Sequence, residues 1–389
     1  MNPFTSEEIQ DYRSLFPVTR HWAYLNHAAV GPFSLPVAQA IQNFTDLALN
    51  EGYTAGPLWQ ERTEQIREKT AQLIGALKED LAFVKNTSHG LSLVAQGLSW
   101  EAGDEIIISE IEFPANVYPW MALQKKGVIL KKIPCLQNEL KLEALDSLVT
   151  DRTRLIALSS VQYGNGYRLP LSEVGKFCRQ KDILFLVDAI QSLGAFPIDV
   201  ELDQIDFLAA DAHKWMLGPE GIGVFYVRKE SLCLLNPVLL GWNSVKDALN
   251  FDHIDFSLKE DAQRFEEGSL NLLSIYALGA AVDLLLKVGV DVIGERILFL
   301  TDRLLDGLDD HGLLLTNSLK PEFRSGIVTF RIPDDSDGSR LKALEHHLFR
   351  EKIYCAVRRG SLRISPHFYN SEEEINRTLL EIHNFLSKP

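Results

Sequence analysis

Short apolar runs alternate with helical segments through the first two thirds of this 389-residue chain. Strands this apolar are typical of a parallel sheet whose two faces are both covered by helices. The helical segments between the runs include 36–76, 88–98, 114–125 and 172–181. The predicted strands are 82–85, 105–109, 128–134, 155–161, 183–188, 206–210 and 223–228. The sequence therefore predicts an α/β fold with a mostly parallel sheet flanked by helices.

After about residue 260 this alternation gives way to longer helices and fewer strands. The elements expected there are helix 274–308, strand 326–332, helix 338–350, strand 353–358 and helix 371–387. No low-complexity linker separates the two regions. We therefore expect a helical lead-in over residues 1–20, a large domain over 21–262, and a smaller α+β domain over 263–389.

Charge and cysteine usage exclude several classes of protein. The chain has 39 basic and 53 acidic residues, a net charge of −14, so its surface repels nucleic acid phosphates. Its four cysteines stand singly, without disulfide or metal-ligand spacing, and we expect reduced thiols and no bound metal. No signal peptide and no charge-free run of about 18 residues is found. We expect a cytoplasmic protein that does not enter a membrane.

Ligands of open α/β sheets bind beyond the carboxyl ends of the strands, so the residues that follow each apolar run are of interest. Thr87, Ser88 and His89 follow strand 82–85 and open a helix. Hydroxyl groups and free N–H groups at a helix N-terminus suit a phosphate. Taken alone, the same residues equally describe an ordinary capping turn.

Two further clusters follow neighbouring strands. Asp188 ends strand 183–188, and Gln191 lies three residues later. A buried acid needs a cationic partner, although an N-cap is the simpler role for an isolated Asp. Lys214 lies between an apolar strand and a Gly/Pro turn, preceded by His213. An amine in apolar surroundings has a lowered pKa and can form a Schiff base, whereas most loop lysines are solvated. Together the three clusters supply donors for a phosphate, an acid for a pyridine nitrogen and an amine for a Schiff base. These are the groups that pyridoxal phosphate (PLP) requires.

The order of these clusters resembles that of the class V aminotransferases, a group of fold type I PLP enzymes. Relatives in this group include cysteine desulfurases, kynureninases and isopenicillin N epimerase-like proteins. The resemblance covers nearly the whole chain, through "YLNHAAVGP", "SEIEFPANVYPW", "VDAIQSLGAFPIDV", "DAHKWMLGPEGIGVFYV", "RFEEGSLN" and "LRISPHFYNSEEEI". It implies a fold type I large domain and PLP as the cofactor.

The resemblance also implies roles for residues around the cofactor. Lys214 would be the Schiff-base lysine and would move the substrate α-proton. Asp188 would pair with the pyridine nitrogen, and Gln191 would contact the phenolic oxygen. The phosphate would be held by Thr87 and Ser88, at the helix start that includes His89.

Further roles concern the edges of the site. His213 would lie against the cofactor near the phosphate. Ser269 would complete the phosphate site from a neighbouring subunit, which implies a homodimer. Arg363 would bind the substrate carboxylate through both ends of its guanidinium. Asn26 and His27 lie in the N-terminal loop that borders the substrate.

The chain also departs from the desulfurase pattern. Where desulfurases place a His over the cofactor ring, Phe113 would stack on the pyridine. Asp211 replaces a Ser, and because a carboxylate repels phosphate we expect it to turn elsewhere. Tyr163 replaces an Asn and would either contact the ring oxygen or pack. Cys355 lies in the apolar run "IYCAVR" without a flexible loop, so we expect a packed thiol and no persulfide chemistry.

These residues favour an aminotransferase that acts on a small amino acid. A PLP-dependent C–S lyase or cysteine desulfurase-like β-eliminating enzyme is the alternative, and an epimerase is a third possibility. A non-catalytic scaffold would require neither Lys214 nor Arg363. A nicotinamide enzyme is disfavoured because no GxGxxG follows an early strand. The sequence does not identify the substrate.

Overall fold

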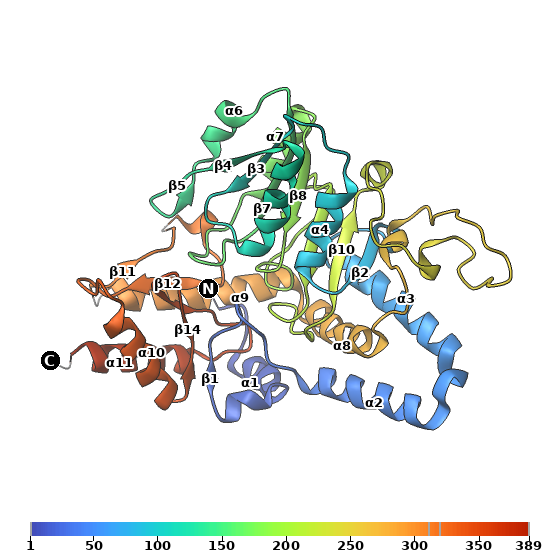
Figure 1. Cartoon of the computed structure of the whole chain (residues 1–389). Helices are drawn as coiled ribbons and strands as arrows, with labels where there is room; N and C mark the ends of the chain where they lie inside the picture. The colour runs from blue at the N-terminus through green and yellow to red at the C-terminus, as the bar shows by residue number, and fades with distance from the viewer. Residues whose placement is uncertain (1, 310–311, 319, 388–389) are drawn as a thin grey trace.

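The computed structural model describes residues 2–309, 312–318 and 320–387 (Figure 1). A seven-stranded sheet at its centre has the order β2-β10-β9-β8-β7-β3-β4. Only β10 runs antiparallel to its neighbours, so six of these strands are parallel. The strands are β2 (Leu81–Val84), β3 (Glu105–Ser109), β4 (Ile129–Ile133), β7 (Thr153–Ser159), β8 (Leu184–Asp188), β9 (Phe207–Asp211) and β10 (Gly223–Val227). The predicted α/β fold is confirmed.

Both faces of this sheet are covered, which explains why its strands are apolar throughout. Along β8, Phe185 and Val187 pack into one hydrophobic cluster and Leu186 packs into another on the opposite face. Side chains alternate between the faces of a strand, so a strand covered on both sides has no place for solvated residues. The covering helices include α4 (Thr87–Gly97), α5 (Tyr118–Leu123) and α7 (Leu171–Gln180) (Figure 1).

Two long helices predicted from the sequence are each broken at a glycine. The segment 36–76 forms α2 (Leu35–Glu51) and α3 (Gly56–Gln72), because Gly52 takes a φ of +55° at a 3-10 turn. The segment 274–308 forms α8 (Leu272–Val288) and α9 (Val290–Asp309), which meet at 79° beside Gly289, with a φ of +89°. Such backbone angles cost glycine little, and they end a helix.

Helix α8 packs against α2 and α3. Within the described residues, no single helix is both long and apolar enough to cross a membrane. Helices α8 and α9 reach that length and hydropathy only when they are counted together, and the pair is sharply bent.

A second sheet has the order β11-β12-β15-β14. Its strands are β11 (Leu314–Leu315), β12 (Val328–Arg331), β14 (Ala356–Arg358) and β15 (Ser361–Ile364), and its helices are α10 (Ser339–Arg350) and α11 (Glu372–Leu386). The predicted strand 353–358 is divided at Cys355, because its first part, β13 (Ile353–Tyr354), pairs instead with β1 (Ala23–Tyr24). The remaining short elements are α1 (Ser6–Ser14), β5 (Cys135–Leu136), β6 (Glu139–Leu140) and α6 (Leu145–Leu148).

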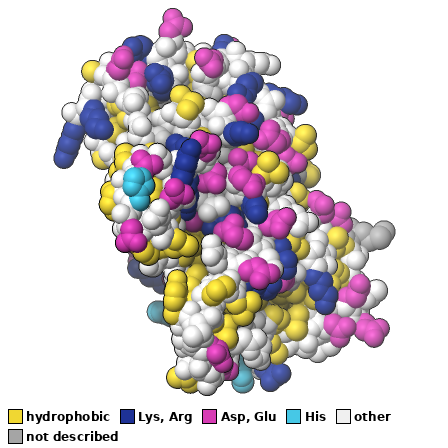
Figure 2. Space-filling model, turned by 90° about the vertical axis from the view of Figure 1, so that its right-hand side faces the viewer, with side chains coloured by type: hydrophobic (Ala, Val, Ile, Leu, Met, Phe, Trp, Pro, Cys, Tyr) yellow, Lys and Arg dark blue, Asp and Glu magenta, His cyan; other side chains and the backbone are white. Residues whose placement is uncertain are grey.

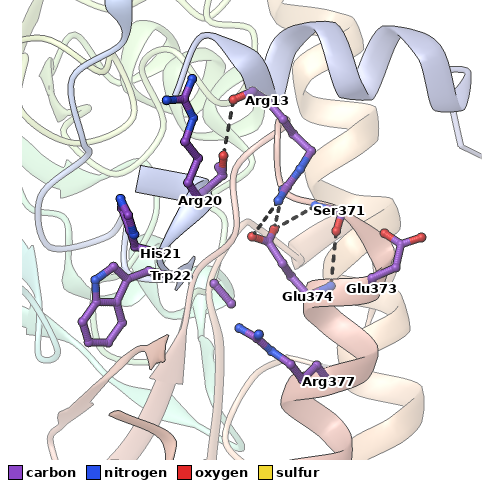
Figure 3. Close-up of a pocket in the computed structure, with 10 residues that line it drawn as sticks. Arg13, Arg20, His21, Trp22, Ser371, Glu373, Glu374 and Arg377 are labelled. Carbon is purple, nitrogen blue, oxygen red and sulfur yellow. Dashed lines mark hydrogen bonds and ion pairs between the residues drawn. The ribbon is translucent and has the colours of Figure 1, made fainter. Parts of the chain in front are cut away.

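The N-terminal segment is fastened to the C-terminal helix (Figure 3). Arg13 of α1 donates two hydrogen bonds, of 2.7 and 3.1 Å, to the Glu374 carboxylate near the start of α11. The two side chains point toward one another beside a polar cavity of about 240 Å³. Ala23 and Leu25 join the hydrophobic cluster of the second sheet. The domain boundaries given above remain a prediction.

Candidate active site

The three predicted clusters follow strands that run in the same direction. Strand β8 ends at Asp188, β9 ends three residues before Lys214, and β2 ends three residues before Thr87. Because β2, β8 and β9 are parallel, their carboxyl ends meet at one edge of the sheet. The fold thus gathers at this edge groups that are up to 127 residues apart in sequence.

Lys214 is only partly exposed, and its Nζ lies 5.7 Å from the centre of the Phe113 ring. Burial lowers the pKa of its amine, and the charge of Arg363 acts in the same direction, while Asp188 opposes the shift. A lowered pKa leaves more of the amine unprotonated near neutral pH. The amine is therefore able to act as a nucleophile or as a base.

Asp188 is 1% exposed, and burial raises the pKa of its carboxyl despite a 3.1 Å hydrogen bond from the Ile190 N–H. No Lys, Arg or His of the described chain lies within ion-pair distance of it. A buried acid in this position is stabilised by a cation, and the protonated pyridine nitrogen of PLP is such a group.

The opposite end of the site is the N-terminus of α4. The Asn86 side chain caps the helix by accepting from the His89 N–H at 2.9 Å. Thr87 is buried, and its hydroxyl accepts from the Asp211 N–H at 3.0 Å, while Ser88 is exposed. These hydroxyl and N–H groups fit a phosphate. The His89 ring instead turns back along the chain, where Nδ1 accepts from the Lys85 N–H at 3.3 Å.

Asp211 turns toward His213, as its departure from the family pattern led us to expect. Its Oδ1 lies 2.9 Å from Nδ1 of His213, an ion-pair contact whose angle is not that of a hydrogen bond. A protonated His213 beside this carboxylate would offset the repulsion between Asp211 and a phosphate.

Two side chains predicted to contact a ligand, those of Gln191 and His27, are hydrogen-bonded within the protein itself. The Gln191 side chain accepts from Trp215 Nε1 at 2.9 Å and donates to the Ala28 carbonyl at 3.1 Å, which leaves one amide hydrogen for a ligand. His27 is fully buried, and its two ring nitrogens contact the Ser365 carbonyl and the Tyr369 hydroxyl. His27 therefore holds the N-terminal loop against the segment 365–369, and its predicted place beside the substrate stays a prediction. Burial also lowers its pKa.

Arg363, Tyr163 and Phe113 form the substrate side of the site. Arg363 is 2% exposed and donates to the Tyr163 carbonyl at 3.1 Å, while its buried Nε has no hydrogen-bond partner. No carboxylate of the described chain pairs with it, and burial lowers its pKa to about 10. The Tyr163 ring packs edge-on against Phe113, which is 44% exposed and so free to stack on a ligand. A buried guanidinium without an acid fits a ligand carboxylate.

Asn26 and Ser269 are the remaining residues that the sequence predicted for the site. Asn26 is buried, and its side-chain oxygen has no partner in the described protein. Ser269 is exposed, on the loop that follows Phe265. The predicted role of Ser269 in a neighbouring subunit remains a prediction.

The sequence model of the class V aminotransferases, described as "Aminotransferase class-V", matches residues 23–378. The chain belongs to the class V aminotransferase family. It is 31% identical over 376 residues to an uncharacterized aminotransferase, YcbU of Bacillus subtilis, and the match covers 96% of this chain and 97% of that protein.

Solved structures similar to this protein cover nearly the whole chain. The apo cysteine desulfurase from Thermococcus onnurineus NA1 has a TM-score of 0.89 at 27% identity, covering 98% of each chain. The cystine C–S lyase C-DES, bound to its product cysteine persulfide, has a TM-score of 0.87 at 25% identity and covers 96% of this chain and 99% of its own. A C-DES variant carries glycine covalently linked to PLP. This class V protein is a PLP-dependent enzyme, and Lys214, Asp188 and Thr87 are the residues that would hold the cofactor.

Cys355 of this class V chain lies between the strands β13 and β14. Strands β14 and β15 are joined by a two-residue turn at Arg359 and Gly360, with φ of +49° and +72°. Cys355 is 5% exposed and burial raises the pKa of its thiol, so it is a poor nucleophile. All four cysteines are free. The expectation that Cys355 is a packed thiol agrees with this geometry.

One buried acid of the site was missed by sequence reasoning. Glu112 precedes Phe113, is 6% exposed, and accepts from the Ser159 N–H at 2.9 Å, from the Gln162 amide at 2.8 Å and from the Ser159 hydroxyl. Burial raises the pKa of Glu112, and its charge raises that of Asp188. Its position after the apolar run "EIIIS" and before an aromatic residue was the available signal.

Proposed function

We propose that this class V enzyme is an aminotransferase, which moves the amino group of a small amino acid to a keto acid. The observation that carries the proposal is the buried Arg363 guanidinium, which has no acidic partner in the described chain and whose charge acts on the Lys214 amine. A free amino acid brings both the carboxylate that Arg363 lacks and the α-proton that Lys214 can remove.

The residues of the large sheet would hold and tune the cofactor. Bound PLP supplies an electron sink for the negative charge that develops at the substrate Cα. The buried Asp188 carboxylate would keep the pyridine nitrogen protonated, because the resulting ion pair relieves its own desolvation. Phe113 would stack on the ring, and the N-terminus of α4 would bind the phosphate.

Lys214 would perform the proton transfers. In its unprotonated form, which burial and the neighbouring Arg363 favour, it accepts the proton from the substrate Cα. Arg363 holds the carboxylate, and this contact orients the Cα–H bond toward the Nζ. The same lysine would return the proton on the cofactor side of the C–N bond, after which water would release the keto acid and leave the amino group on the cofactor. An acceptor keto acid would then take up this amino group by the same steps in reverse.

A second candidate is a C–S lyase that cleaves a Cβ–S bond by β-elimination. The similarity to the cystine C–S lyase C-DES favours it, and this reaction needs no cysteine on the enzyme. The similarity to cysteine desulfurases favours the desulfurase alternative to some extent. Sulfur transfer through a persulfide on Cys355 is disfavoured, because this thiol is buried and the β14–β15 turn is short.

A homodimer is part of the proposal. Figure 2 shows apolar side chains exposed on the side from which α2, α3 and the segment after β10 project. Tyr53 is 83% exposed, and Ile254 is 91% exposed, together with exposed Leu249, Phe251 and Phe256. Apolar side chains that are exposed together on one side of a protein are often covered by a partner chain. A second copy covering it would bring a partner chain close to the site, where Ser269 would contribute to the phosphate contacts.

A panel of amino acids, each followed for keto acid, sulfide and ammonia, tests the proposed function. Keto acid formation that requires an added keto acid as acceptor supports the aminotransferase. Sulfide released together with pyruvate and ammonia, without an acceptor, supports the C–S lyase instead.

A further inference from the structure

The β14–β15 hairpin carries three arginines: Arg358 at the end of β14, Arg359 in the turn and Arg363 on β15. In the register of these strands Arg358 lies opposite Ser361, and Ala356 lies opposite Arg363. Residues that face one another across two strands lie on the same face of the sheet, and so do alternate residues of one strand. Arg358 therefore shares a face with Ser361, and Ser361 shares it with Arg363. The Cα atoms of Arg358 and Arg363, as diagonal neighbours, are about 7–8 Å apart.

The three arginines differ in what they contact. Arg359 leans on the Tyr163 ring, 6.0 Å from its centre, and donates to the Ile111 carbonyl at 3.4 Å. Arg358 is exposed, and within the described residues it donates only to the carbonyl of its neighbour Val357, at 2.8 Å. In the described part of the chain, neither Arg358 nor Arg363 forms an ion pair with an Asp or Glu. Two like charges therefore share one face without a counter-ion from the protein.

The charge of Arg358 acts on the reacting groups. Burial lowers the pKa of the Arg363 guanidinium and of the Lys214 amine, and the charge of Arg358 adds to both shifts. Like charges held together cost free energy, and an anion between them offsets this cost. The cofactor phosphate is an unsuitable candidate for this anion, because its expected site is the N-terminus of α4 on the large sheet, whereas β14 and β15 belong to the small one.

We propose that Arg358 is a specificity-determining residue that binds a second anionic group, so that the substrates of this enzyme are acidic amino acids. The inference rests on the proposed function, in which Arg363 takes the α-carboxylate. The α-carboxylate of a substrate carries one negative charge, which neutralises the charge of Arg363 and leaves that of Arg358. A side-chain carboxylate of the same substrate, extending along the face of the β14–β15 ribbon, would meet Arg358. Neutral amino acids would leave Arg358 without a counter-ion.

Substrate discrimination is measured with pairs that differ in charge and hardly in size. We expect kcat/KM for aspartate or glutamate to exceed that for asparagine or glutamine at least tenfold. Arg358→Gln is expected to reduce this ratio to below about twofold, and Arg358→Lys to retain most of it. Arg340→Gln removes the same charge from an exposed position at the start of α10, and should leave the ratio unchanged. An unchanged ratio in Arg358→Gln would overturn the proposal.

Binding to the cofactor-free protein separates this inference from the proposed function. By calorimetry, succinate should bind at least tenfold more tightly than propionate, and Arg358→Gln should abolish that difference. Arg363→Gln should weaken both ligands. Equal binding of the two acids by the wild-type protein, or a preference that survives in Arg358→Gln, means that Arg358 is a solvated surface residue, whatever reaction the enzyme performs.

Discussion

Replacement of Glu112 tests how the loop that carries Phe113 is held over the site. Oε1 of Glu112 accepts from the Ser159 N–H and the Gln162 amide, and Oε2 accepts from the Ser159 hydroxyl. In Glu112→Gln the side-chain oxygen can keep the first two bonds, while the new amide donates to the hydroxyl, which is able to accept. We therefore expect Glu112→Gln to remain within about 1 kcal/mol of the wild type in its free energy of unfolding.

Glu112→Ala removes the acceptor from all three groups. Each buried polar group left without a partner costs about 1–3 kcal/mol, so three groups at the lower end cost about 3 kcal/mol. Because Phe113 is the next residue, its ring should also lose its fixed position, and PLP should bind less tightly to Glu112→Ala. Urea denaturation of the cofactor-free protein measures the loss of stability, and titration with PLP measures the weaker binding of the cofactor.

Glu79→Ala, which removes an exposed acid, serves as a control and should change the stability by no more than about 0.5 kcal/mol. A loss of less than about 1 kcal/mol in the free energy of unfolding of Glu112→Ala would show that these hydrogen bonds do not hold the loop. Equal destabilisation of Glu112→Gln and Glu112→Ala would show instead that the negative charge matters and not the hydrogen-bond geometry.

Three further outcomes are expected. Lys214→Ala should abolish the visible absorption band of bound PLP, and a band that persists in this variant would show that another amine carries the cofactor. Cys355→Ser should retain at least half of wild-type turnover, because the thiol is buried away from solvent, and loss of nearly all turnover would restore the desulfurase alternative. Burial lowers the pKa of His367 to about 4. As the pH falls below 6.5, the unfolded chain therefore takes up a proton on this histidine before the folded protein does, and the free energy of unfolding should fall by about 3 kcal/mol between pH 6.5 and 4. His367→Gln should flatten this slope in acid denaturation, whereas His253→Gln, at an exposed position, should leave it steep.

The strand pattern predicted the large sheet and the edge at which the site lies, because apolar runs and the residues that follow them are local features. Asp188, Lys214 and Thr87 were selected as candidate site residues in this way. The breaks at Gly52 and Gly289 were missed, because a glycine within a helical pattern ends the helix only when the packing of both halves requires a bend. The surrounding pattern is equally compatible with a continuous helix.

Roles that depend on distant partners could not be predicted from single positions. Glu112 acts through Ser159 and Gln162, which are 47 and 50 residues away along the chain. His27 contacts Ser365 and Tyr369, at the other end of the chain, and so its burial became evident only in the folded protein. A single sequence shows none of these pairings, and the side chains on their own allow either packing or ligand binding.

The fate of the substrate nitrogen tests the central claim most directly. The holoenzyme is incubated with a ¹⁵N-labelled amino acid and an unlabelled keto acid, and the label is followed by mass spectrometry. We expect nearly all of the ¹⁵N lost by the donor to appear in the amino acid formed from the acceptor, one equivalent for each keto acid produced. Label recovered as free ammonia at the same rate, with or without the acceptor, would contradict the aminotransferase assignment.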